Sequence, residues 1–227
     1  MSTRKTLYVV RHGQTEWNLA QRMQGRLDSA LTETGRRQAD VHGRTLARLG
    51  GAQALLVSPL GRTRATAELL NAHLGSTVRL ADALMERDSG DWSGLTLAEI
   101  EAAHPEQWRA RQADPYHHRP PGGENLVDME GRVAGLLESL LQAPEEVVVL
   151  VTHGVMSRVI VKRLANLSAQ VAVTVRHPNE LFYRLELSAQ GDASSAYFID
   201  GQGPQHGLLQ HSGDGTFSRQ RRQPTEE

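Results

Sequence analysis

The chain has 227 residues, of which 39% are hydrophobic and 22% are charged, values typical of a soluble globular protein with room for one domain and a substantial core. The formal net charge of −1 leaves no basic excess to neutralise a phosphate backbone, so no nucleic-acid partner is expected. No apolar run approaches the roughly 20 residues of a membrane-spanning helix, and the N-terminus shows no secretory signal. Together with the absence of cysteine, this predicts a cytoplasmic protein without membrane contact.

The spacing of apolar residues predicts strands that alternate with helices. The expected elements are a strand at 7–10, a helix at 32–49, a strand at 55–57, a helix at 60–74, short helices at 97–104 and 105–112, a helix at 126–141, a strand at 147–151, a helix at 155–164, and strands at 182–187 and 196–199. This order predicts an α/β fold, a three-layer α/β/α sandwich in which a mainly parallel sheet carries helices on both faces.

The domain organisation follows from the same elements. We expect a single domain over residues 1–200. Within it, residues 86–125 mix turn residues with the two short helices and are expected to form an inserted lid, called the lid segment below. Residues 201–227 are rich in Gly, Gln, Ser and Arg, and we expect them to form a flexible tail.

Two histidines stand at corresponding places, each directly after a predicted strand. His12 lies in Arg11-His12-Gly13 after the first strand, and His153 lies in Thr152-His153-Gly154 after the strand at 147–151. Ligands of parallel sheets collect at the carboxyl ends of the strands. An isolated histidine in such a place is more often a hydrogen-bonded core residue than a functional one. Two of them at one edge of a sheet favour a functional site.

The stretch of sequence that contains His12 resembles the signature of a known family. Arg11-His12-Gly13-Gln14-Thr15-Glu16-Trp17-Asn18 resembles the signature of the histidine phosphatase superfamily, the phosphoglycerate mutase-like proteins. Further pieces follow in the order of that family: Gln24-Gly25, Leu31-Thr32-Glu33-Thr34-Gly35, Ser58-Pro59-Leu60-Gly61-Arg62-Thr63, Glu86 ahead of Gly90-Asp91-Trp92-Ser93-Gly94, and Thr152-His153-Gly154. The resemblance covers roughly residues 5 to 188, and several ordered pieces are far more specific than one.

The resemblance implies that His12 accepts a phosphoryl group from a small phosphate ester. Neutral imidazole suits this role because it avoids charge repulsion with a phosphate dianion. The planar guanidinium groups of Arg11 and Arg62 suit the phosphoryl oxygens, to which they can donate in pairs. The residues expected to bind the substrate phosphate are Arg11, His12, Asn18, Arg62, His153 and Gly154, of which Arg11, His12, Arg62 and His153 are also expected to be catalytic.

The resemblance also assigns Glu86 as the general acid that protonates the leaving alkoxide and as the base that then activates water. The cationic side chains supply the electrostatic stabilisation of the transferred group, so we expect neither a metal nor another cofactor. The pair His117-His118 has no second ligand pair at a defined spacing and is expected to be solvated. The candidates for substrate specificity are Gln24, Gly25, Arg87 and Trp92.

The pattern around Trp92 and the compact stretch at 122–125 resemble the phosphatase branch with broad substrate range. We therefore expect a phosphatase that hydrolyses small phosphomonoesters through a phosphohistidine. Phosphoglycerate mutase activity and a non-catalytic phosphate-binding relative remain alternatives. The expected partner is a small phosphorylated metabolite, and the protein is expected to be a monomer or a homodimer.

Overall fold

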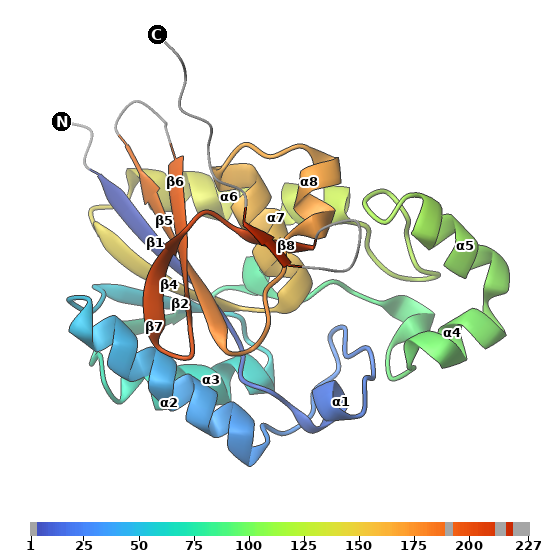
Figure 1. Ribbon diagram of the computed structural model, residues 1–227, viewed down its shortest axis with the longest axis horizontal. Helices are drawn as coiled ribbons and strands as arrows, with labels where there is room; N and C mark the ends of the chain where they lie inside the picture. The colour runs from blue at the N-terminus through green and yellow to red at the C-terminus, as the bar shows by residue number, and fades with distance from the viewer. Residues whose placement is uncertain (1–3, 189–192, 212–216, 220–227) are drawn as a thin grey trace, which may run out of the picture.

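A seven-stranded mixed sheet forms the centre of the molecule (Figure 1). The computed structural model describes residues 4–188, 193–211 and 217–219. The strand order is β3-β2-β4-β1-β5-β6-β7. The parallel strands are β1 (Lys5–Arg11), β2 (Ala54–Val57), β3 (Thr77–Leu80) and β4 (Val147–Thr152). The antiparallel strands are β5 (Leu181–Leu187), β6 (Ala193–Ile199) and β7 (Gln202–His206).

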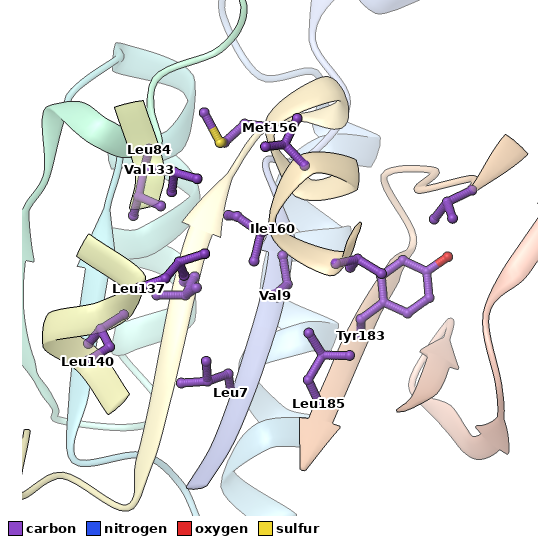
Figure 2. Close-up of a cluster of buried hydrophobic side chains, with 14 of the residues drawn as sticks. Leu7, Val9, Leu84, Val133, Leu137, Leu140, Met156, Ile160, Tyr183 and Leu185 are labelled. Atoms are coloured by element: carbon purple, nitrogen blue, oxygen red, sulfur yellow. The ribbon is translucent and has the colours of Figure 1, made fainter. Parts of the chain in front are cut away.

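Helices cover both faces of the sheet because side chains along each central strand alternate between its two faces. On β1, Tyr8 and Val10 pack with α2 (Glu33–Arg48) and α3 (Gly61–Asn71). Leu7 and Val9 face the opposite way and pack with α6 (Leu126–Gln142) and α7 (Gly154–Leu164), as Figure 2 shows. Burial of each large apolar side chain contributes about 1.5–3 kcal/mol. The expected α/β sandwich is confirmed, and its parallel core continues into an antiparallel edge.

The helices begin where side chains can accept hydrogen bonds from free backbone N–H groups. Thr32 accepts from Gly35 N at the start of α2, and Asn125 accepts from Asp128 N at the start of α6. Both helices were predicted within one residue of their observed ends. The remaining helices are α1 (Glu16–Leu19), α4 (Leu97–Ala103), α5 (Pro105–Ala113) and α8 (Ala169–Thr174), with 3₁₀ turns at Asp82–Leu84 and Gly90–Trp92.

The lid segment has a small core of its own. Helices α4 and α5 project from the sheet at one end of the molecule (Figure 1). Trp92, Ile100 and Trp108 are buried together there, apart from the two clusters that cover the sheet. No helix among the described residues combines the length and the apolar character that crossing a bilayer requires.

The prediction of a flexible tail from residue 201 is wrong for residues 201–211. Gln202–His206 forms β7 and pairs with β6, while β8 (Leu209–His211) pairs with β9 (Phe217–Arg219). β7, with the sequence Gln-Gly-Pro-Gln-His, lies at the edge of the main sheet, where pairing needs backbone groups and few apolar side chains. The sequence analysis also missed β3, where polar and apolar residues alternate over only four positions and all four side chains are exposed. The remaining tail residues lie outside the described part.

Buried His42 predicts that the protein loses stability in acid. Burial lowers the pKa of His42 to about 4, and its Nε2–H donates to the carbonyl of Asn179 over 3.0 Å. As the pH falls, this histidine therefore binds a proton in the unfolded chain near its ordinary pKa of 6.5, before it does so in the folded protein. This group alone should lower the free energy of unfolding by about 2 kcal/mol between pH 7 and pH 5.

Urea denaturation of the His42→Gln variant checks this, since glutamine keeps a donor for Asn179 and does not titrate. The difference in unfolding free energy between pH 7 and pH 5 should shrink by about 2 kcal/mol relative to the original protein. His206→Gln, on the exposed part of β7, is the matched control and should leave the difference as it was. Equal acid sensitivity of both variants and the original protein would contradict the assignment.

Candidate active site

Two neighbouring parallel strands bring the predicted histidines together. Arg11 at the end of β1 is paired in register with Thr152 at the end of β4. His12 and His153 follow directly, and His12 N donates to Thr152 O over 3.0 Å. Their ring centroids lie 5.3 Å apart at an interplanar angle of 59°. The expected meeting of the two imidazoles at the carboxyl edge of the sheet is therefore observed.

Glycine is required after His12 by close backbone packing. A Cβ on Gly13 would lie 2.2 Å from the carbonyl oxygen of Gly35, and a Cβ on Gly35 would lie 2.0 Å from the carbonyl oxygen of Gln14. Neither distance is possible, so the loop after β1 can rest on the first turn of α2 only with glycine at both positions. Gly13 N also donates to Thr66 Oγ1 over 3.0 Å, which ties this loop to α3.

The imidazole of His12 is held in one tautomer. Its Nδ1 lies 2.8 Å from the carbonyl oxygen of Gly13, which can only accept, so Nδ1 carries the proton. Burial lowers the pKa of His12 well below its usual value, and the charges of Arg11 and Arg62 lower it further. The ring is therefore neutral at pH 7, with the lone pair of a nucleophile on Nε2.

A cavity of about 170 Å³ lies in front of His12. Its lining residues are Arg11, His12, Asn18, Arg22, Met23, Gln24, Gly25, Arg62, Glu86, Arg87, Ser89 and Val155. Eight of these had been singled out from the sequence. The side chains at its floor combine a neutral imidazole with guanidinium groups and one carboxylate, a set suited to a phosphate monoester.

Arg62 is fixed by hydrogen bonds to a loop far from it in sequence. It lies in the first turn of α3, and its guanidinium donates to the carbonyls of Gly25 and Leu27 over 2.8 and 2.6 Å. It also pairs with Asp28 over 2.8 Å, while the same carboxylate accepts from Gly61 N over 2.6 Å and so caps α3. Burial lowers the pKa of Arg62, and nearby carboxylates oppose the shift. The guanidinium is therefore held in one place as a cation.

Arg11 and Asn18 border the cavity from the first strand and the loop after it. Arg11 donates to the carbonyl of His177 over 2.7 Å, and its buried Nε has no hydrogen-bond partner among the described residues. Burial lowers the pKa of Arg11 to about 10, which leaves it charged at pH 7. The Asn18 Oδ1 accepts from Thr15 N over 3.1 Å, so the amide of Asn18 offers its N–H groups to a ligand.

Glu86 occupies the N-terminus of α7. Its two carboxylate oxygens accept from Val155 N and Met156 N over 3.1 and 3.2 Å, and one of them also accepts from Arg87 N over 2.8 Å. The free N–H groups at this helix start need acceptors, and the carboxyl group of Glu86 supplies them. The sequence analysis expected Gly154, the first residue of this helix, to bind the substrate phosphate. In the structure the N–H groups of the next two residues orient the candidate acid.

His153 and Gly154 lie behind the lining of the cavity. His153 is fully buried, with Nε2 2.8 Å from Ser58 Oγ and Nδ1 without a partner among the described residues. Gly154 packs against Arg11, since a Cβ on Gly154 would lie 3.3 Å from Cζ of that guanidinium. Both residues therefore support the floor of the site in this structure.

Of the four specificity candidates, three line the cavity and one does not. Gln24 donates to Thr15 Oγ1 over 2.8 Å, and Gly25 and Arg87 lie beside it in the lining. Trp92 is fully buried in the core of the lid segment and stacks on His118 with ring centroids 5.2 Å apart. It cannot reach a ligand from there, so its assignment to substrate specificity is corrected to a supporting role in the lid segment.

Sequence reasoning missed several supporting residues. Asp28 pairs with Arg62, Ser58 contacts His153, and Asn179 Nδ2 donates to the carbonyl of His12 over 2.8 Å. Asn179 is 167 residues from His12 in the chain, and no local pattern marks it. Among the described residues no group of three or more histidines, aspartates and glutamates is placed to hold a metal ion.

Comparison with known proteins identifies relatives of this chain. The chain is 34% identical over 199 residues to a probable phosphoglycerate mutase GpmB of Erwinia tasmaniensis, covering 87% of this chain and 92% of the relative. It is 39% identical over 161 residues to glucosyl-3-phosphoglycerate phosphatase of Mycobacterium tuberculosis, covering 66% and 70%.

A solved structure of a mycobacterial glucosyl-3-phosphoglycerate phosphatase with inorganic phosphate superimposes with a TM-score of 0.75 at 30% identity, covering 88% of this chain and 100% of the other. The family model described as histidine phosphatase superfamily (branch 1) matches residues 7–199, which include every element of the cavity described above. The chain belongs to the histidine phosphatase superfamily.

Proposed function

We propose that the protein hydrolyses small phosphomonoesters through a phosphohistidine on His12. The observation that carries this proposal is the neutral His12 ring, held by Gly13 through Nδ1, at the floor of a cavity that Arg11 and Arg62 also line. Relatives named as phosphatases support the reaction class.

In the first step, Nε2 of His12 attacks phosphorus, and the bond between phosphorus and the ester oxygen breaks. Arg11 and Arg62 stabilise the charge on the phosphoryl oxygens, and Glu86 in its protonated form gives its proton to the leaving alkoxide. The buried Nδ1 of His153, which has no partner among the described residues, supports a role for that ring beside the phosphoryl group.

In the second step, Glu86 accepts a proton from water, and the resulting hydroxide attacks phosphorus as the bond to Nε2 breaks. Inorganic phosphate leaves, and His12 and protonated Glu86 are restored. The hydrogen bonds from Val155 N and Met156 N orient the carboxyl group of Glu86 for both steps.

Phosphoglycerate mutase activity is the second candidate, favoured by the relative named as a probable mutase. A mutase keeps the phosphoryl group on histidine while the product reorients, whereas a phosphatase passes it to water. Incubation with 3-phosphoglycerate, with and without 2,3-bisphosphoglycerate, separates the two. We expect phosphate release without stimulation by the bisphosphate. Rapid, bisphosphate-dependent formation of 2-phosphoglycerate would favour the mutase.

Replacement of the proposed nucleophile tests the covalent step. His12→Ala should lower kcat/KM for p-nitrophenyl phosphate by at least about 10³-fold, because a nucleophile has no substitute in this cavity. Acid quenching during turnover of a ³²P-labelled ester should trap acid-labile label on the original protein and none on the variant. His206→Ala, on β7, is the control. Unchanged turnover by His12→Ala would exclude the mechanism. If the variant loses turnover but no label is trapped on the original protein, the phosphohistidine intermediate is excluded.

Replacement of Glu86 separates its proton transfer from a structural role. Glu86→Gln should lower kcat/KM for glycerol 1-phosphate by about 10²-fold or more, because the alkoxide needs a proton. The loss for p-nitrophenyl phosphate should be much smaller, since p-nitrophenolate leaves without one. Glu101→Gln, exposed on α4, should change neither value. Equal losses of Glu86→Gln on both esters would show that the residue does not act as the general acid.

A further inference from the structure

The peptide unit that joins His12 to Gly13 is hydrogen-bonded at both of its polar ends. Its carbonyl, on His12, accepts from Nδ2 of Asn179 over 2.8 Å. Its N–H, on Gly13, donates to Oγ1 of Thr66 over 3.0 Å. The two partners come from separate parts of the chain, since Thr66 lies on α3 and Asn179 lies in the loop between α8 and β5. The orientation of this one peptide therefore depends on two distant elements.

Both partners are themselves fixed by the surrounding structure. Thr66 is fully buried, and its hydroxyl donates to the carbonyl of Arg62 over 2.8 Å, so its oxygen meets the N–H of Gly13 as an acceptor. The backbone carbonyl of Asn179 accepts from Nε2 of His42 over 3.0 Å. Each contact to the peptide is therefore made by a group that has little freedom to follow it if it moves.

The orientation of this peptide determines where the imidazole of His12 finds its acceptor. Nδ1 of the ring donates to the carbonyl oxygen of Gly13 over 2.8 Å, and that carbonyl directly follows the peptide. Gly13 has no Cβ, so its backbone angles are set by contacts of this kind and not by a side chain. An unpaired buried N–H or carbonyl is costly, so the loss of either partner favours rotation of the peptide. Rotation would move the acceptor away from Nδ1.

We propose that Thr66 and Asn179 are positioning residues for the nucleophile, because they hold the peptide that keeps the imidazole proton of His12 on Nδ1 and the lone pair on Nε2. The tautomer of a histidine is set by the hydrogen bond that its other ring nitrogen makes. The inference rests on the proposed function, in which Nε2 attacks phosphorus. Neither residue is among those that line the cavity, so both act through His12 and not on the substrate.

Nitrogen NMR of the ligand-free protein tests the inference without turnover. In protein labelled with ¹⁵N at histidine, the ring nitrogens of His12 report which of them carries the proton, and His12→Ala identifies their signals. We expect the Nδ1–H form alone in the original protein. Thr66→Val and Asn179→Leu keep the shape of each side chain without its polar groups, and each should make the Nε2–H form detectable. Folded variants that keep only the Nδ1–H form would overturn the proposal.

The rate of attack by His12 gives a second readout. The value of kcat/KM for p-nitrophenyl phosphate is expressed per competent site, and calorimetric titration with inorganic phosphate counts these sites. Thr66→Val and Asn179→Leu should each lower it by about fivefold or more, as expected for the loss of one hydrogen bond between neutral groups. If the loss disappears once competent sites are counted, the two residues only stabilise the fold, and the proposal is wrong.

Matched variants separate this effect from the loss of any similar hydrogen bond. Thr66→Ser keeps the hydroxyl and should retain kcat/KM within about threefold. Thr45 is a buried threonine on α2 whose hydroxyl donates over 2.8 Å to the carbonyl four residues earlier, as that of Thr66 does. Asn71 is a half-buried asparagine at the end of α3 whose amide donates to a loop carbonyl over 3.1 Å. Thr45→Val and Asn71→Leu should change neither the tautomer nor kcat/KM.

The two readouts keep this inference separate from the proposed reaction. If the tautomer shifts in Thr66→Val and Asn179→Leu but the original protein hydrolyses no ester, the two residues set the ring and only the proposed function fails. If the original protein hydrolyses esters and both variants match it in tautomer and in kcat/KM, only this inference fails. Asn179 lies in a half-buried loop, so its variant decides the matter if Thr66→Val does not fold.

Discussion

The site depends on the pairing of β1 with β4. Because the two strands are parallel neighbours and Arg11 stands opposite Thr152, the next residue of each strand is a histidine at the same edge of the sheet. The loop after β1 then rests on α2, where Gly13 and Gly35 leave no room for a side chain. A shift of either strand by one residue would turn its side chains to the opposite face and separate the two rings.

Hydrogen bonds to backbone groups offset part of the free-energy cost of burying charged side chains in the site. Arg62 donates to two carbonyls and Arg11 to one, so these buried cations are partly satisfied before any ligand arrives. Glu86 instead accepts hydrogen bonds from backbone N–H groups, which hold its carboxyl group in place. Groups fixed in this way need little reorganisation when charge moves during phosphoryl transfer, which is the main advantage of a preorganised site.

The lid segment contributes to the same cavity as the sheet edge, since Glu86, Arg87 and Ser89 line it together with Arg11 and His12. The rest of the segment packs around Trp92, Ile100 and Trp108, apart from the two clusters that cover the sheet. The cavity therefore combines a wall from the rigid sheet edge with a wall from a loop-rich segment, and loops of this kind vary more readily than the sheet that carries them.

The sequence by itself determined the α/β class, the strand ends that carry His12 and His153, and most of the cavity lining, because these follow from local apolar patterns and short motifs. It did not reveal β3, which has only four residues, all exposed, or β7, which is polar and mostly exposed. Only the tertiary structure decided that Glu86 caps α7, that Asp28 holds Arg62, and that Trp92 is buried. These contacts join residues far apart in the chain, and they depend on how whole elements pack, which local periodicity does not encode.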